Sequence, residues 1–174
     1  LDFELRGSHR WLQNVITHEF AHIVSLQKAM KAGTSVPGAY FQFMNYEEEK
    51  RPDVLYGYPN TLVSYPVPGT IVPPWLAEGT AQYMYDDADW DNWDSHRDMI
   101  LRDRVINGNL LSFTEMNTFG KKGIGNESTY NAGYALANYI SNEYGSDKLS
   151  GIMEELSSPF QFSIDKAIKN VVGK

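Results

Sequence analysis

Two histidines and a glutamate lie within five residues of one another near the start of the chain. Residues 18–22 read His-Glu-Phe-Ala-His. On an α-helix, residues four positions apart lie on one face about one turn apart, so the imidazoles of His18 and His22 can point at a single metal ion. Imidazole nitrogen is a common zinc ligand, and catalytic zinc sites use three protein ligands and water. The spacing therefore predicts a Zn²⁺ site with two ligands identified.

Glu19 directly follows the first candidate ligand. Its carboxylate can reach a metal-bound water without being a ligand, which is the arrangement described for zinc metalloproteases. A pattern with three fixed positions can also arise by chance, and paired histidines can simply cap a surface. The apolar surroundings favour the metal site, because a solvated pattern would more often have charged neighbours. On this interpretation we expect Phe20 and Ala21 to be buried in the helix packing.

A third ligand has to come from elsewhere in the chain. Thiolates are excluded because there is no cysteine, and the position six residues beyond the second histidine holds Lys28. A carboxylate, His9 or His96 therefore remains. The strongest candidate is Glu78, which lies among apolar residues where an unpaired charge is costly. Alternatively, Glu78 could lie in the first turn of a helix and be stabilised by the helix dipole.

The two motifs together resemble those of the gluzincin zinc metallopeptidases. His18–His22 match the first motif, and Trp75–Gly79 match the Trp-Leu-x-Glu-Gly motif of a bacterial branch. A weaker, patterned similarity continues through Tyr130–Ile140, Tyr144-Gly145 and Phe162–Ala167. Gluzincins generally have a mixed β-sheet before the motif helix, whereas only Leu1–Arg6 precedes it here. Substrate-binding parts are then missing or supplied by the segment 34–74.

The resemblance implies a zinc-dependent peptide hydrolase that acts on a peptide or protein substrate. It implies His18, His22 and Glu78 as Zn²⁺ ligands. Glu19 would be the general base that activates the zinc-bound water. Relatives often stabilise the oxyanion with a tyrosine or histidine of a downstream helix, and Tyr130, or Tyr134 one turn later, is the candidate here. The resemblance also implies secretion to a bacterial envelope or beyond, within a longer protein that has other domains.

Two other functions are open on the sequence alone. The chain could be an inactive peptidase-like module that binds zinc or a peptide without cleaving it. It could also be a binding or structural part of a larger envelope protein, with the proline- and tyrosine-rich segment 34–74 as the interaction surface.

Composition limits the function classes. The 174 residues fit one domain, 42% of them are hydrophobic, and the absence of cysteine excludes disulfides. The formal net charge of −7 argues against nucleic acid, which requires clustered Lys and Arg. No apolar run has the length of a membrane span. The acidic run Asp86–Asp94 lacks the EF-hand ligand order, so a solvated loop is expected rather than a calcium site. Because the sequence begins with Leu1, a mature form or excised fragment is expected.

Periodicity and capping signals predict the elements. A helix is expected over Ser8–Lys31, ended by Gly33, and strands over Tyr40–Tyr46 and Thr61–Val67. The further helices are expected over Pro74–Tyr85, Ser95–Asn107, Glu127–Tyr144, Lys148–Leu156 and Ile164–Asn170, with a Ser112–Glu115 capping box. The expected fold is a single α+β, zincin-like domain over residues 1–174, mainly helical, with a short β-rich excursion after the motif helix.

Overall fold

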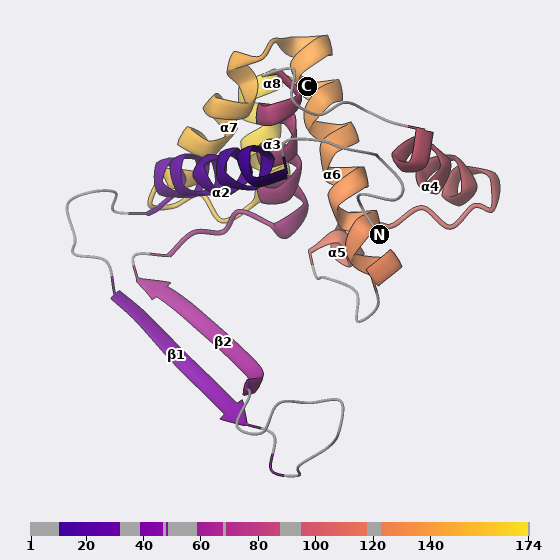
Figure 1. Cartoon of the computed structure of the whole chain (residues 1–174). Helices are drawn as coiled ribbons and strands as arrows, with labels where there is room; N and C mark the ends of the chain where they lie inside the picture. The colour runs from indigo at the N-terminus through magenta and orange to yellow at the C-terminus, as the bar shows by residue number, and fades with distance from the viewer. Residues whose placement is uncertain are drawn as a thin grey trace.

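The computed structural model describes residues 11–31, 39–46, 48, 59–67, 69–87, 95–117 and 123–173. Seven helices and two strands occur in these ranges: α2 Trp11–Lys28, β1 Ala39–Tyr46, β2 Pro59–Val67, α3 Pro74–Asp87, α4 Ser95–Ile106, α5 Phe113–Met116, α6 Gly123–Tyr144, α7 Asp147–Ser157 and α8 Ile164–Val172. The helices gather into one body, and the two strands form a hairpin that stands clear of it (Figure 1).

The expected α+β, zincin-like class is wrong. The described residues are mainly helical, and the expected β-rich excursion reduces to one two-stranded antiparallel hairpin. An α+β domain needs a sheet with one face packed on helices, and two strands are too few to form such a layer. The mainly helical character that the sequence predicted is confirmed.

The positions of the two strands agree closely with the sequence prediction. β1 begins one residue and β2 two residues before the expected start, and both end where expected. Their antiparallel register pairs Phe43 with Val63 and Met44 with Leu62, and it shifts between Asn45 and Tyr46. β-Branched and aromatic residues favour this extended backbone.

Most helix boundaries lie at or near the capping and helix-ending residues that the sequence predicted. Ser112 caps α5 through the reciprocal bonds with Glu115 that define a capping box. Gly145, with a φ of 112°, follows the last residue of α6. The end of α2 is an exception, because the helix ends at Lys28, three residues before the expected end. Ser8 and Gly33, the expected boundary residues of this helix, lie outside the described residues.

The hydrophobic core lies mainly between α3, α6 and α7. Its largest fully buried apolar side chains are Trp75, Tyr134, Leu76, Leu149, Ile152, Met153 and Leu156. α8 closes one side by packing Ala167 into this cluster. The core therefore holds α3 in a fixed position against α6.

Two glycines bring α3 and α6 into backbone contact. A Cβ atom on Gly133 would lie 3.1 Å from the carbonyl carbon of Trp75 and 3.2 Å from the nitrogen of Gly79, and inside van der Waals contact of the Trp75 carbonyl oxygen. Further along the same two helices, the hydroxyls of Tyr83 and Ser141 hydrogen-bond at 2.5 Å. Only residues without a side chain permit this approach, which sets the position of the first turns of α3.

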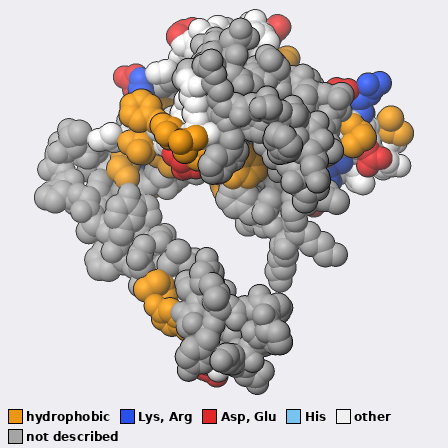
Figure 2. All heavy atoms as spheres, in the orientation of Figure 1, with side chains coloured by type: hydrophobic (Ala, Val, Ile, Leu, Met, Phe, Trp, Pro, Cys, Tyr) orange, Lys and Arg blue, Asp and Glu red, His pale blue; other side chains and the backbone are white. Residues whose placement is uncertain are grey.

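α2 packs one face on the helical body and leaves the opposite face open. Ala21 and Ala29 are buried, as the sequence predicted for Ala21. The prediction for Phe20 is wrong, because its side chain is 63% exposed. Phe20 points about 100° away from Ala21 around the helix, and it joins an exposed apolar stripe formed by Leu12, Ile16, Phe20, Ile23 and Val24. Figure 2 shows hydrophobic side chains at the surface over α2 and over the hairpin.

Candidate metal centre

The helix α2 places two imidazoles side by side. His18 and His22 lie one turn apart, their ring centroids are 4.5 Å apart, and the ring planes are nearly perpendicular at 89°. The two Nε2 atoms are 3.0 Å apart. Both side chains are mostly buried, with 14% and 17% of their surface exposed. The four-residue spacing thus produces the shared focus that the sequence predicted.

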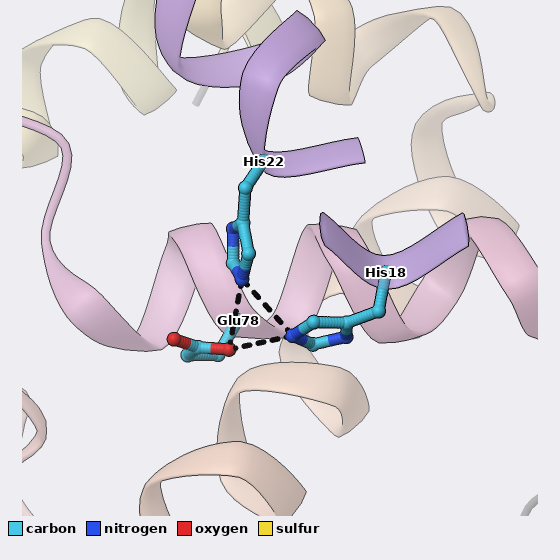
Figure 3. A group of neighbouring side chains, drawn as sticks. All are labelled: His18, His22 and Glu78. Atoms are coloured by element: carbon cyan, nitrogen blue, oxygen red, sulfur yellow. Dashed lines mark hydrogen bonds and ion pairs between the residues drawn. The ribbon is translucent and has the colours of Figure 1, made fainter. Parts of the chain in front are cut away.

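The helix α3 brings the third group, Glu78, to the same point. Its Oε2 lies 3.0 Å from Nε2 of His18 and 3.1 Å from Nε2 of His22. Figure 3 shows the two rings and the carboxylate pointing toward one another from α2 and α3. Among the described residues, His18, His22 and Glu78 form the one group of three His, Asp or Glu side chains placed closely enough to hold a metal ion. Sixty and fifty-six residues of sequence separate Glu78 from the two histidines, so only the packing of α3 on α2 joins them.

The three polar atoms form a triangle that hydrogen bonds cannot satisfy completely. A carboxylate oxygen carries no hydrogen and each Nε2 carries at most one, so at most two of the three contacts can be hydrogen bonds. A cation between the three atoms would interact favourably with all of them. Ligand atoms of a tetrahedral zinc ion, with bonds of about 2.0–2.1 Å, lie about 3.3 Å apart. The observed separations of 3.0–3.1 Å are only slightly shorter, so the donor set and its spacing fit zinc.

Charge interactions keep Glu78 ionised. Burial raises the pKa of Glu78, but hydrogen bonds to His18 and His22 and the charges of these rings lower it to about 2. Burial lowers the pKa of His22, and the hydrogen bond and charge of Glu78, with the charge of Glu19, outweigh burial and raise it above its usual value. A metal ligand has to be deprotonated. Glu78 meets this condition at neutral pH, and because the pKa of His22 is raised, a proton competes with the metal for this ring more strongly than for an ordinary imidazole.

The other predicted site residues lie at different places around this triad. Glu19 is exposed on α2 and is not one of the three converging groups, as a base that is not a ligand requires. The Tyr130 ring stacks on the His18 ring, with centroids 6.2 Å apart and planes 28° apart. Tyr134 is only 1% exposed in the core, which removes it as a group that contacts substrate. His9 and the side chain of His96 lie outside the described residues.

The sequence prediction missed the residues that set the position of Glu78. Gly79 directly follows Glu78, and Gly133 is the contact of Gly79 on α6. The sequence feature that could have identified them is that each lies inside a predicted helix, Gly79 in 74–85 and Gly133 in 127–144. Glycine in a helix interior lowers helix stability by about 1 kcal/mol relative to alanine, so it usually has a packing reason. Among the described residues, the buried Nδ1 atom of His22 has no hydrogen-bond partner. The ring is therefore oriented by the packing of α2 on α3 and by the contacts of its Nε2 atom.

Comparisons of the chain with protein-family models, with curated proteins and with solved structures found no match. Among the described helices, none combines the length and the apolar character needed to cross a membrane.

Proposed function

We propose that this chain is a zinc-dependent peptide hydrolase of the gluzincin type. The observation that carries the proposal is the convergence of His18, His22 and Glu78 on one point, with Glu19 next to the first of them. Two imidazoles and one carboxylate are the ligand set of several catalytic zinc sites. The same set also suits Fe(II), but the carboxylate that follows the first histidine favours hydrolysis, because this is where a general base is needed.

In the proposed hydrolysis, the triad, Glu19 and Tyr130 have different roles. Zinc held by the triad would supply Lewis-acid polarisation of the scissile carbonyl and a lower pKa of the attacking water. Glu19, which is exposed beside the triad, takes the water proton and passes it to the leaving amine. The ring of Tyr130 lies against His18, so its hydroxyl is the candidate for a hydrogen-bond donor to the developing oxyanion.

The direct test combines metal content with turnover. We expect about one zinc per chain by elemental analysis of the wild-type protein, and loss of zinc in His22→Ala and Glu78→Ala. Glu143→Ala, which removes an exposed carboxylate of α6, is the matched control and should keep its zinc. Glu19→Gln should keep zinc and lose hydrolysis of a mixed fluorogenic peptide library.

The outcomes separate the alternatives. A folded wild-type protein that binds no zinc after zinc is added back would refute the proposal, and iron in its place would change the reaction class. Zinc that is bound and lost as expected, without peptide cleavage by the wild type, would favour the inactive zinc- or peptide-binding module.

A further inference from the structure

Among the described residues β1 and β2 pair only with each other, and the two outer edges of this hairpin, called its free edges below, differ in composition. β1 reads Ala-Tyr-Phe-Gln-Phe-Met-Asn-Tyr and contains neither a charged residue nor a proline. β2 begins with Pro59 and contains Pro66 near its other end. Charged side chains and prolines are the features by which proteins prevent an edge strand from pairing with another chain. β2 therefore has this protection, and β1 lacks it.

The register shows which backbone groups of β1 remain open. Pro66 pairs with Tyr40, and because proline has no N–H to donate, this pair belongs to the set whose backbone groups point away from the partner strand. Such pairs alternate along an antiparallel ladder. The Met44–Leu62 pair, four residues further along with no intervening register shift, is in the same set. The N–H of Met44 thus faces the free edge of β1, and Pro66 removes one donor from the free edge of β2.

The hairpin also exposes apolar side chains on both of its faces. Phe43 and Met44 are 64% and 45% exposed, and they point to opposite faces because successive side chains of a strand alternate. A two-stranded hairpin is at best marginally stable in water, and additional strands are needed for independent stability. The hairpin stands clear of the helices (Figure 1), so the helical body does not obstruct a strand that approaches β1.

We propose that two copies of this chain associate by antiparallel pairing of their β1 edges. The product is a four-stranded sheet in the order β2–β1–β1–β2, with a two-fold axis through its centre. This arrangement turns two marginal hairpins into one sheet and shields apolar surface of both copies.

The charges and the prolines select this mode of pairing. Glu48 is exposed two residues beyond the end of β1. Antiparallel pairing places the two Glu48 residues at opposite ends of the paired strands, whereas parallel pairing would place them side by side, where like charges repel. The outer strands of the four-stranded sheet are the two copies of β2, and Pro66 weakens their free edges. Assembly therefore stops at a closed dimer.

The dimer is expected to be weak. An eight-residue strand is about 26 Å long, and pairing along one strand edge covers less than the roughly 800 Å² per partner of a standard interface. We therefore expect a dissociation constant in the micromolar range.

Sedimentation velocity between about 1 and 300 µM protein tests the proposal. The wild-type protein should pass from monomer to dimer. Met44→Pro removes an N–H from the free edge of β1 and should weaken dimerisation at least about tenfold. Leu62→Pro is the matched control, because it removes an N–H from the free edge of β2 within the same cross-strand pair, and it should dimerise like the wild type.

Three results would overturn the proposal. They are a monomer over the whole concentration range, growth beyond the dimer, and equal weakening by the two proline variants. Amide hydrogen exchange of the wild-type protein does not depend on how the variants fold. The Met44 amide should exchange more slowly at high concentration than at low concentration, and equal rates would also contradict pairing at this edge.

Discussion

Gly133→Ala is expected to disturb the candidate metal centre without changing any of its three proposed ligands. The added Cβ would lie 3.1 Å from the carbonyl carbon of Trp75 and 3.2 Å from the nitrogen of Gly79, and closer still to the Trp75 carbonyl oxygen. All of these are backbone atoms of a helix, which cannot rotate out of the way. Glu78 precedes Gly79 in the same turn, so any movement of α3 away from α6 carries the carboxylate with it.

The magnitude follows from the space required. Ordinary carbon contacts are about 3.5–4.0 Å, so α3 and α6 have to separate by roughly 1 Å near Gly133. Overpacking of this kind costs about 1–3 kcal/mol or more, and alanine recovers about 1 kcal/mol of helix propensity over glycine. Because the added Cβ would meet only backbone atoms, the upper end of this cost applies, and we expect a net loss of about 2 kcal/mol in the free energy of unfolding. Metal–ligand distances tolerate only about 0.2 Å, so zinc affinity should fall by a factor on the order of ten or more.

Two measurements check this prediction. Urea unfolding of the metal-free protein gives the change in stability, and a zinc titration against a competing chelator gives the change in affinity. Gly151→Ala in α7 is the control, because its Cβ would meet Cγ1 of Val171 at 3.1 Å, and this side-chain atom can move. That variant should be as stable as the wild type or slightly more stable. If Gly133→Ala matched the control in both measurements, the close contact of α3 with α6 would be refuted as the feature that positions Glu78.

Further predictions concern ligand protonation, the tyrosine and the attachment of α2. The pKa of His22 is raised, and His22 has to be deprotonated to bind zinc. Below this pKa, protonation of His22 alone should lower the zinc affinity by about tenfold per pH unit. Glu78, with a pKa of about 2, stays ionised over this range and should not add to the fall. Zinc affinity that stays constant in calorimetric titrations from about pH 8 to about pH 5 would contradict the expected effect of His22. Tyr130→Phe should lower kcat by about a hundredfold and leave the zinc content unchanged, whereas unchanged kcat would exclude this hydroxyl as the oxyanion donor. Lys31→Met should cost about 2 kcal/mol of stability in urea unfolding, because the Lys31 ammonium donates to three carbonyl oxygens, those of Leu156, Ser158 and Gln161. Lys28→Met removes a solvent-exposed ion pair with Glu154 and an exposed hydrogen bond to Ser150 and should cost about 0–1 kcal/mol, so equal losses in the two variants would contradict the special role of Lys31.

Local sequence rules predicted most of the elements because their causes are local. The Ser112–Glu115 capping box and the end of α6 at Gly145 depend on residues within one turn. The focus of His18 and His22 is also local, since it follows from their four-residue spacing on one helix. The strands were recognised for the same reason, because β-branched and aromatic residues between prolines favour an extended backbone.

Tertiary packing decided the features that join distant segments. The apolar surroundings of His18 and His22 indicated that α2 is packed but not which of its faces α3 would cover, so Ala21 was placed correctly and Phe20 was not. The α+β class was wrong because the number of strands that assemble into a sheet depends on partners beyond the strands themselves. The sequence by itself determined the two histidines, Glu19 as the candidate base beside them, and Glu78 as a candidate ligand. Only tertiary packing decided that these three side chains meet at one point, because α3 packs on α2 and its position is set by the close contact of Gly79 with Gly133 on α6.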